Sequence, residues 1–237
     1  MSKQLLILTL STFLFAGIQS SNAQTSHGVF NDLLKKYVSS DGAVNYKGFQ
    51  SEEARLDKYL ANLKANHPNK SWSRNERLAY WINAYNAFTI KLILDNMPVQ
   101  SIMDIHGGKA WDVKFIELGS SYYSLNQIEN DIIRPVFQEP RIHFAVNCAA
   151  KSCPPLRNEA YTAAKLNEQL EEQTRKFIRN AQFNSLKAKE IKISKIFEWY
   201  AVDFPTLISF INRYSTIKIS PNAKIAYFEY NWSLNGK

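Results

Sequence analysis

Apolar positions along the chain fall mostly at the three- and four-residue spacing of amphipathic helices. This spacing predicts helices over residues 27–38 and about 51–65, and a longer helix that starts after Ser73 and runs to about Asn96. Ser73 and Glu76 have the capping-box spacing at its start. Because this longer helix is apolar nearly all round, we expect it to be buried at the centre of the fold.

Apolar and polar residues alternate over residues 142–147, which predicts a half-buried strand that ends in a loop before Pro154-Pro155. The other predicted elements are a hairpin over 113–123, helices near 124–135, over 163–180 and from Phe197 onward, and strands over 190–194 and 225–230. Helices and short strands without regular βαβ alternation indicate an α+β fold. In it, a buried central helix packs on a small, mostly antiparallel sheet and is surrounded by further helices.

The first 23 residues have the pattern of a secretory signal peptide. Lys3 precedes an apolar run from Leu5 to Gly17, and Ser21-Asn22-Ala23 is a small-residue cleavage signal. The run is too short for a spanning helix, and no later stretch is long and apolar enough to cross a bilayer. We therefore expect cleavage near Ala23, a periplasmic or secreted protein, and a single globular domain over residues 24–237.

The formal net charge is +8, but the basic residues are scattered and no nucleic-acid module is recognisable. A solvated basic surface is the simplest interpretation, and no nucleic-acid partner is expected. His106-Gly107-Gly108-Lys109 lacks the spacing of a phosphate-binding loop, so no cofactor is predicted either. The expected partner is a small molecule or a peptide of unknown identity.

Residues 141–156 contain His143 and both cysteines of the chain, Cys148 and Cys153. In an exported protein, two cysteines close in sequence favour a structural disulfide. A second interpretation is a Cys148 thiol nucleophile with His143 as its base, because a neighbouring imidazolium lowers a thiol pKa. In a straight strand the two side chains would lie on opposite faces, so this second interpretation needs a bulge near Asn147.

Two further interpretations of the cysteines stay open. A metal site could use His143, Cys148, Cys153 and His106, but the spacing is not a standard zinc pattern, and no metal site is predicted. The cysteines could also be two inert thiols. Outside this segment, His106 is an alternative base.

Asn83 and Asn86 lie one turn apart inside the predicted buried helix. A buried amide without hydrogen-bond partners costs about 1–3 kcal/mol, so both side chains must be satisfied. They either cap a neighbouring loop or strand end, or contact a substrate and orient the catalytic groups.

Five separated motifs resemble the family called domain of unknown function 547, most strongly over residues 75–235. They are residues 76–87, 123–129, 141–156, 195–200 and 230–235. The resemblance implies one domain with no established reaction. The motif positions that it carries over to this chain are Trp81, Asn83, Asn86, Glu129, Arg134, His143, Cys148, Cys153 and Trp199.

A buried helix followed by a His-bearing strand is also similar to the layout of transglutaminase-like and papain-like folds. In those folds the nucleophilic cysteine lies near the start of the helix, where this chain has Asn83 and no cysteine.

Two hypotheses follow, and whether the protein is an enzyme stays open between them. The first is a hydrolase or acyl-transferase with a pocket built on His143, Cys148 and the Asn83/Asn86 helix. Its catalytic residues would be His143, Cys148 and Asn83, and its binding residues Asn86, His106, Trp81 and Glu129. The second is a non-catalytic ligand- or peptide-binding module with a Cys148–Cys153 disulfide and an aromatic platform of Trp111, Trp199 and Tyr200.

Overall fold

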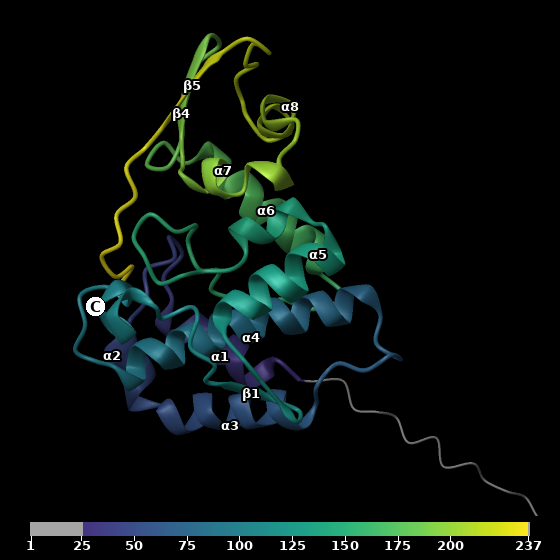
Figure 1. Cartoon of the computed structure of the whole chain (residues 1–237), viewed down its shortest axis with the longest axis vertical. Coiled ribbons are helices and arrows are strands. Elements are labelled where there is room, and N and C mark those ends of the chain that lie inside the picture. The colour runs from purple at the N-terminus through teal and green to yellow at the C-terminus, as the bar shows by residue number, and fades with distance from the viewer. Residues whose placement is uncertain (1–25, 237) are drawn as a thin grey trace, which may run out of the picture.

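The computed structural model of the chain describes residues 26–236 (Figure 1). The predicted signal peptide, residues 1–23, lies outside the described residues. Within residues 26–236, no helix has both the length and the apolar character needed to cross a membrane.

Helix α4 (Arg74–Asp95) is the centre of the fold. Its predicted capping box is confirmed, because the Glu76 N–H donates to Ser73 Oγ (3.2 Å) and the Ser73 N–H donates to Glu76 Oε2 (2.6 Å). From Leu78 to Leu94 every residue except Lys91 is buried. The predicted buried central helix is therefore confirmed.

One cluster of buried side chains surrounds α4. The helices α2 and α3 pack on α4, and α1 packs on both of them. The elements of this part are α1 (Gly28–Tyr37), α2 (Tyr46–Ser51), α3 (Glu53–Ala65), the 3₁₀ segment η1 (Ile102–Gly108), the antiparallel strands β1 (Ile116–Leu118) and β2 (Ser121–Tyr123), the π-helix η2 (Gln127–Ile133) and α5 (Arg134–Phe137). The predicted hairpin turn at Gly119, with φ +60°, is confirmed.

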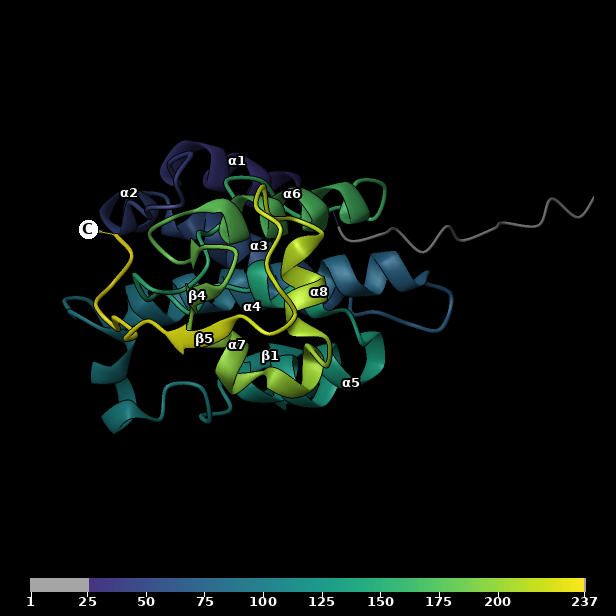
Figure 2. The same ribbon diagram turned by 90° about the horizontal axis from the view of Figure 1, so that it is seen from above.

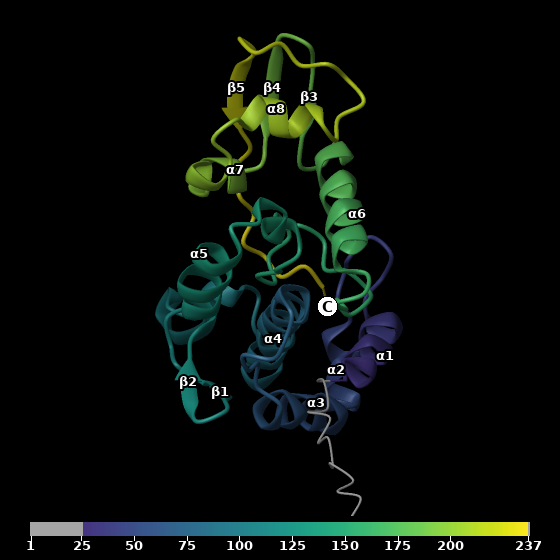
Figure 3. The same cartoon turned by 90° about the vertical axis from the view of Figure 1, so that its right-hand side faces the viewer.

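A second buried cluster lies above the first and is rich in phenylalanine (Figure 3). Its strands are in the order β3-β4-β5, with β3 antiparallel and β5 parallel to β4. The elements here are α6 (Leu166–Arg179), β3 (Ser185–Leu186), β4 (Glu190–Ile193), α7 (Ile196–Trp199), the 3₁₀ turn η4 (Ala201–Asp203), α8 (Leu207–Asn212) and β5 (Lys224–Tyr227). Helices and short strands without βαβ alternation confirm the α+β class.

The C-terminal segment joins the two clusters. After β5 it crosses the molecule toward α2 (Figure 2). Its residues form isolated bridges from Ser233 to Ser101, from Leu234 to Ala150 and from Gly236 to Val44. The last residues of the chain therefore lie against segments from its first two thirds.

The predicted strand over residues 142–147 is wrong. Pro140–Phe144 form the 3₁₀ helix η3, which begins with a proline and is capped by the Glu139 carboxylate. Ile142 is buried in the first cluster, whereas Phe144 is buried in the second. The alternation of apolar residues thus reflects a helical turn buried on two sides rather than the two faces of a sheet.

Candidate functional site

A cavity of about 190 Å³ lies where α4, η2, η3, α7 and the C-terminal segment meet. It is lined by Tyr85, Trp111, Asn126, Glu129, Asn130, His143, Val146, Cys148, Cys153, Pro154, Ile196, Trp199, Tyr200, Tyr230 and Trp232. A wider groove of about 1440 Å³ reaches Cys153 and Asn147 but not His143 or Glu129. We place the candidate site in the smaller cavity because the titratable groups converge there.

His143 is fixed in orientation by the second half of the chain. Its Nε2 lies 2.7 Å from Asp203 Oδ2, which also accepts from Arg134 Nε at 2.6 Å. The Tyr200 ring stacks on the imidazole, with 4.0 Å between the ring centroids. The hydrogen bonds from His143 and Arg134 hold the pKa of Asp203 well below its usual range. With an Nε2–H group donating to the ionised Asp203 carboxylate, the acceptor nitrogen of a neutral imidazole would be Nδ1.

That acceptor nitrogen has no hydrogen-bond partner among the described residues, although His143 is only 2% exposed. The nearest ionic contact of Nδ1 is Glu129 Oε1, at 3.9 Å, which is too far for a hydrogen bond. A buried unpaired nitrogen is costly and uncommon, and in a cavity water, a ligand or a reactant can complete its bonding.

The two cysteines follow in the loop after η3 and differ in environment. Cys148 is half-buried, with its sulfur 3.2 Å from the Tyr230 hydroxyl. Cys153 is buried and lies 3.1 Å from Cys148 without a bond between the two, so the predicted disulfide is not confirmed. Hydrogen bonding to Cys153 lowers the pKa of the Cys148 thiol, whereas burial raises the pKa of Cys153. Cys148 is therefore the sulfur that ionises more readily.

The loop that presents Cys148 is held by the central helix. Asn86 Nδ2 donates to the Ala145 carbonyl (2.9 Å), and Asn86 Oδ1 accepts from the Asn147 N–H (2.8 Å). Ala149 has φ +63°, which is rare for a residue other than glycine, and its N–H donates to Asn147 Oδ1 (2.9 Å). The 3₁₀ helix η3 and the loop after it, rather than a bulged strand, bring Cys148 and His143 to the same cavity. Strained residues such as Ala149 cluster at functional sites.

Asn83 holds a different loop in the same way. Its Nδ2 donates to the Tyr161 carbonyl (2.7 Å), and its Oδ1 accepts from the Tyr161 N–H (2.9 Å). Both buried asparagines therefore cap loops, as the first of the two interpretations expected. Neither side chain lines the cavity, and Asn86 acts on the site only through the backbone before Cys148.

Some of the predicted site residues line the cavity, and others do not. His143, Cys148 and Glu129 line it, together with the predicted platform of Trp111, Trp199 and Tyr200. Trp81 packs instead between His67 and Tyr123, and His106 is exposed on η1. The fold therefore does not form a cleft that is lined jointly by Asn83, Asn86, His106 and His143.

Sequence reasoning missed Asp203, Tyr230 and Trp232. Asp203 lies 60 residues after His143, and no local pattern marks it as a partner. Tyr230 and Trp232 belong to a motif, residues 230–235, but the sequence did not indicate that this segment returns to the cysteine loop. Among the described residues, no group of three or more His, Cys, Asp or Glu is arranged to hold a metal ion.

A model of the family described as "Protein of unknown function, DUF547" matches residues 69–178. This segment includes α4, Glu129, His143 and both cysteines, whereas Asp203 and Tyr230 lie beyond it. No curated protein and no solved structure matches the chain, so the similarity to transglutaminase-like and papain-like layouts stays a prediction. Residues 69–178 of the chain thus match DUF547, a family of proteins of unknown function.

Proposed function

We propose that the protein is a thiol-dependent hydrolase or acyl-transferase that acts after export, with Cys148 as nucleophile and His143 as base. One observation carries the proposal: the Cys148 thiol and a His143 ring oriented by Asp203 line the same small cavity. A thiol with lowered pKa, a base and an orienting carboxylate are the parts that nucleophilic catalysis needs.

In the proposed reaction, the Cys148 thiol gives its proton to His143 Nδ1, and the thiolate attacks the acyl carbon and forms a carbon–sulfur bond. The electron pair of the carbonyl moves to its oxygen and returns as the leaving group departs with a proton from His143. Water or an acceptor amine or alcohol then gives its proton to His143 Nδ1 and attacks the thioester, which releases Cys148. The Asp203 carboxylate, 2.7 Å from Nε2, stabilises the imidazolium that forms in each half-reaction.

The direct test is capture of the acyl-enzyme. The purified protein is mixed with p-nitrophenyl acetate, and its peptides are examined by mass spectrometry while nitrophenol release is followed. We expect an acetyl group on Cys148, and turnover that iodoacetamide and Cys148→Ser both abolish. Lys151→Ala, an exposed change in the same loop, is the matched control and should behave as the wild type. Full turnover by Cys148→Ser would reject the thiol mechanism.

A non-catalytic binding module is the second candidate, and the aromatic wall of the cavity favours it. Trp232 lies 5.6 Å from Trp111 and 5.8 Å from Trp199 between ring centroids. Such a wall offers a large apolar contact surface at low entropic cost. This candidate predicts ligand binding that survives the double variant Cys148→Ser/His143→Ala, with no acyl-enzyme in the wild type.

A further inference from the structure

We propose that the cavity recognises its substrate through a positively charged ammonium group, held between the Glu129 carboxylate and the aromatic wall. The inference rests on the proposed function for the reaction that follows binding. The recognition itself depends only on charge and shape, and it can be measured without turnover.

The charge of the cavity differs in sign from that of the whole protein. The formal net charge of the chain is +8, yet no Lys or Arg is among the residues that line the cavity. Glu129 is the one carboxylate in that lining. A ligand anion would meet no fixed cation there, whereas a ligand cation would meet a carboxylate.

Glu129 is 6% exposed, so its carboxylate has lost most of its water. Its carboxylate is hydrogen-bonded to Tyr200 and lies 3.9 Å from His143 Nδ1, and Arg134 attracts it but makes its ion pair with Asp203. A buried carboxylate that has no Lys or Arg in an ion pair with it is costly to maintain. An ammonium group beside it would supply the missing charge and up to three N–H donors.

Aromatic rings form much of the rest of the cavity lining. Three tryptophans and three tyrosines line the cavity, and Tyr230 lies 4.5 Å from Trp232 between ring centroids. The faces of such rings attract cations, most strongly those of tryptophan. Trp199, at 48% exposed, marks the side that is open to solvent, where the rest of a ligand can leave the cavity.

The size of the cavity limits which ligands can bind. A volume of about 190 Å³ corresponds to roughly six water molecules of liquid. It accommodates a short alkylammonium group, free or at the end of a lysine side chain. With Glu129 and Cys148 in one lining, the ammonium group belongs to the acyl donor, because a protonated amine has no lone pair with which to attack a thioester.

The test measures binding to Cys148→Ser, which lacks the proposed thiol nucleophile, by tryptophan fluorescence and calorimetry. The probes are n-butylammonium, its neutral counterpart n-butanol, and the anion butyrate. We expect the cation to bind at least about tenfold more tightly than the alcohol. N-acetyl-lysine methylamide, tested beside butylammonium, distinguishes a lysine side chain from a free amine.

Glu129→Gln in the same background should remove most of the preference for the cation while keeping the size of the side chain. Asp131→Asn removes an equal charge from an exposed position on η2 and should keep the preference. Circular dichroism and melting temperature check that both variants are folded. Equal binding of alcohol and cation, tighter binding of butyrate, an unchanged preference in Glu129→Gln, or no binding of any probe would overturn the inference. Acyl-enzyme formation by the wild type is scored separately, so either idea can fail alone.

Discussion

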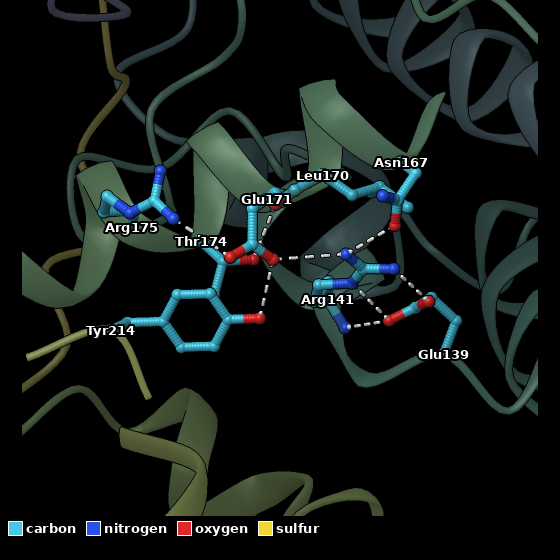
Figure 4. Close-up of polar contacts among 8 residues, drawn as sticks. All are labelled: Glu139, Arg141, Asn167, Leu170, Glu171, Thr174, Arg175 and Tyr214. Atoms are coloured by element: carbon cyan, nitrogen blue, oxygen red, sulfur yellow. Dashed lines mark hydrogen bonds and ion pairs between the residues drawn. The ribbon is translucent and has the colours of Figure 1, made fainter. Parts of the chain in front are cut away.

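Two polar clusters meet on the short helix η3, and they differ in how completely their groups are bonded. Arg141 belongs to one polar cluster, and His143, two residues later, belongs to the other. Arg141 makes a bidentate pair with Glu139 (2.8 and 2.7 Å), and its Nη1 donates to Asn167 (3.0 Å) and Glu171 (3.3 Å) (Figure 4). Two charges and one amide thus surround a single guanidinium.

Glu171, on α6, also accepts several hydrogen bonds. Besides Arg141, it accepts from the Tyr214 hydroxyl (3.1 Å) and from Arg175 (3.0 Å), as Figure 4 shows. Burial raises the pKa of Glu139 and its bonds to Arg141 lower it, with a net lowering. The Arg141 cluster thus connects η3 to α6 and to the segment just after α8. Its charged groups are hydrogen-bonded to one another.

The His143 cluster is bonded on one side only. Nε2 has Asp203, but Nδ1 has no hydrogen-bond partner, and the buried Glu129 carboxylate lies 3.9 Å away. Polar groups only two residues apart on η3 thus have different roles. Complete bonding is typical of a framework, whereas incomplete bonding around a cavity indicates where a reactant binds. Four experiments test this contrast.

The largest effect is expected from His143→Gln, which keeps a hydrogen-bonding group near Asp203 but removes the base. Turnover of p-nitrophenyl acetate should fall by about 10²–10⁴-fold, the usual contribution of a general base. The melting temperature should change little. An equal loss of activity from Arg141→Gln would show that the two clusters do not differ in the proposed way.

The paired substitutions Asn86→Ala and Asn83→Ala are expected to have the next largest effect. Each removes two bonds to buried backbone groups, and each should lower the free energy of unfolding by about 2–4 kcal/mol in urea titrations. Only Asn86→Ala should also slow alkylation of Cys148, because only Asn86 holds the loop before it. Equal slowing by both would assign the effect to general loss of stability.

Arg141→Ala tests the framework cluster itself. Its side chain is 16% exposed and Glu139 is left without its bidentate partner, so we expect a loss of about 2 kcal/mol of stability. The matched control is Lys187→Ala, which breaks an exposed pair with Glu190 and should cost at most about 0.5 kcal/mol. Comparable losses from the two would contradict the assignment of a structural role to the Arg141 cluster.

The smallest effect is the pH dependence carried by Asp203. Its pKa is lowered in the folded state, so the stability that it contributes is present above the unfolded-state pKa of about 3.9 and is lost as the pH falls below it. In Asp203→Asn, the unfolding free energy should decline less steeply than in the wild type between about pH 5 and pH 2. Parallel urea-midpoint curves for the two proteins would exclude this contribution.

The helices could be predicted because their signals are local. Ser73 and Glu76, like Ser124 and Gln127, cap a helix through groups only three residues apart. The buried face of α6, with Leu166, Leu170, Phe177 and Ile178, follows from spacing along one helix. Propensity, capping and periodicity act within a few turns, so the residue order alone contains them.

The site depended on contacts that residue order does not contain. Residues 142–147 have the alternation of a strand, but Ile142 and Phe144 are buried in different hydrophobic clusters. The 3₁₀ helix η3 allows both side chains to be buried. The partner of His143 lies 60 residues later, and Tyr230 reaches Cys148 across 82 residues. Long-range packing chooses these neighbours, because burial of many apolar side chains outweighs the local preference of one short segment.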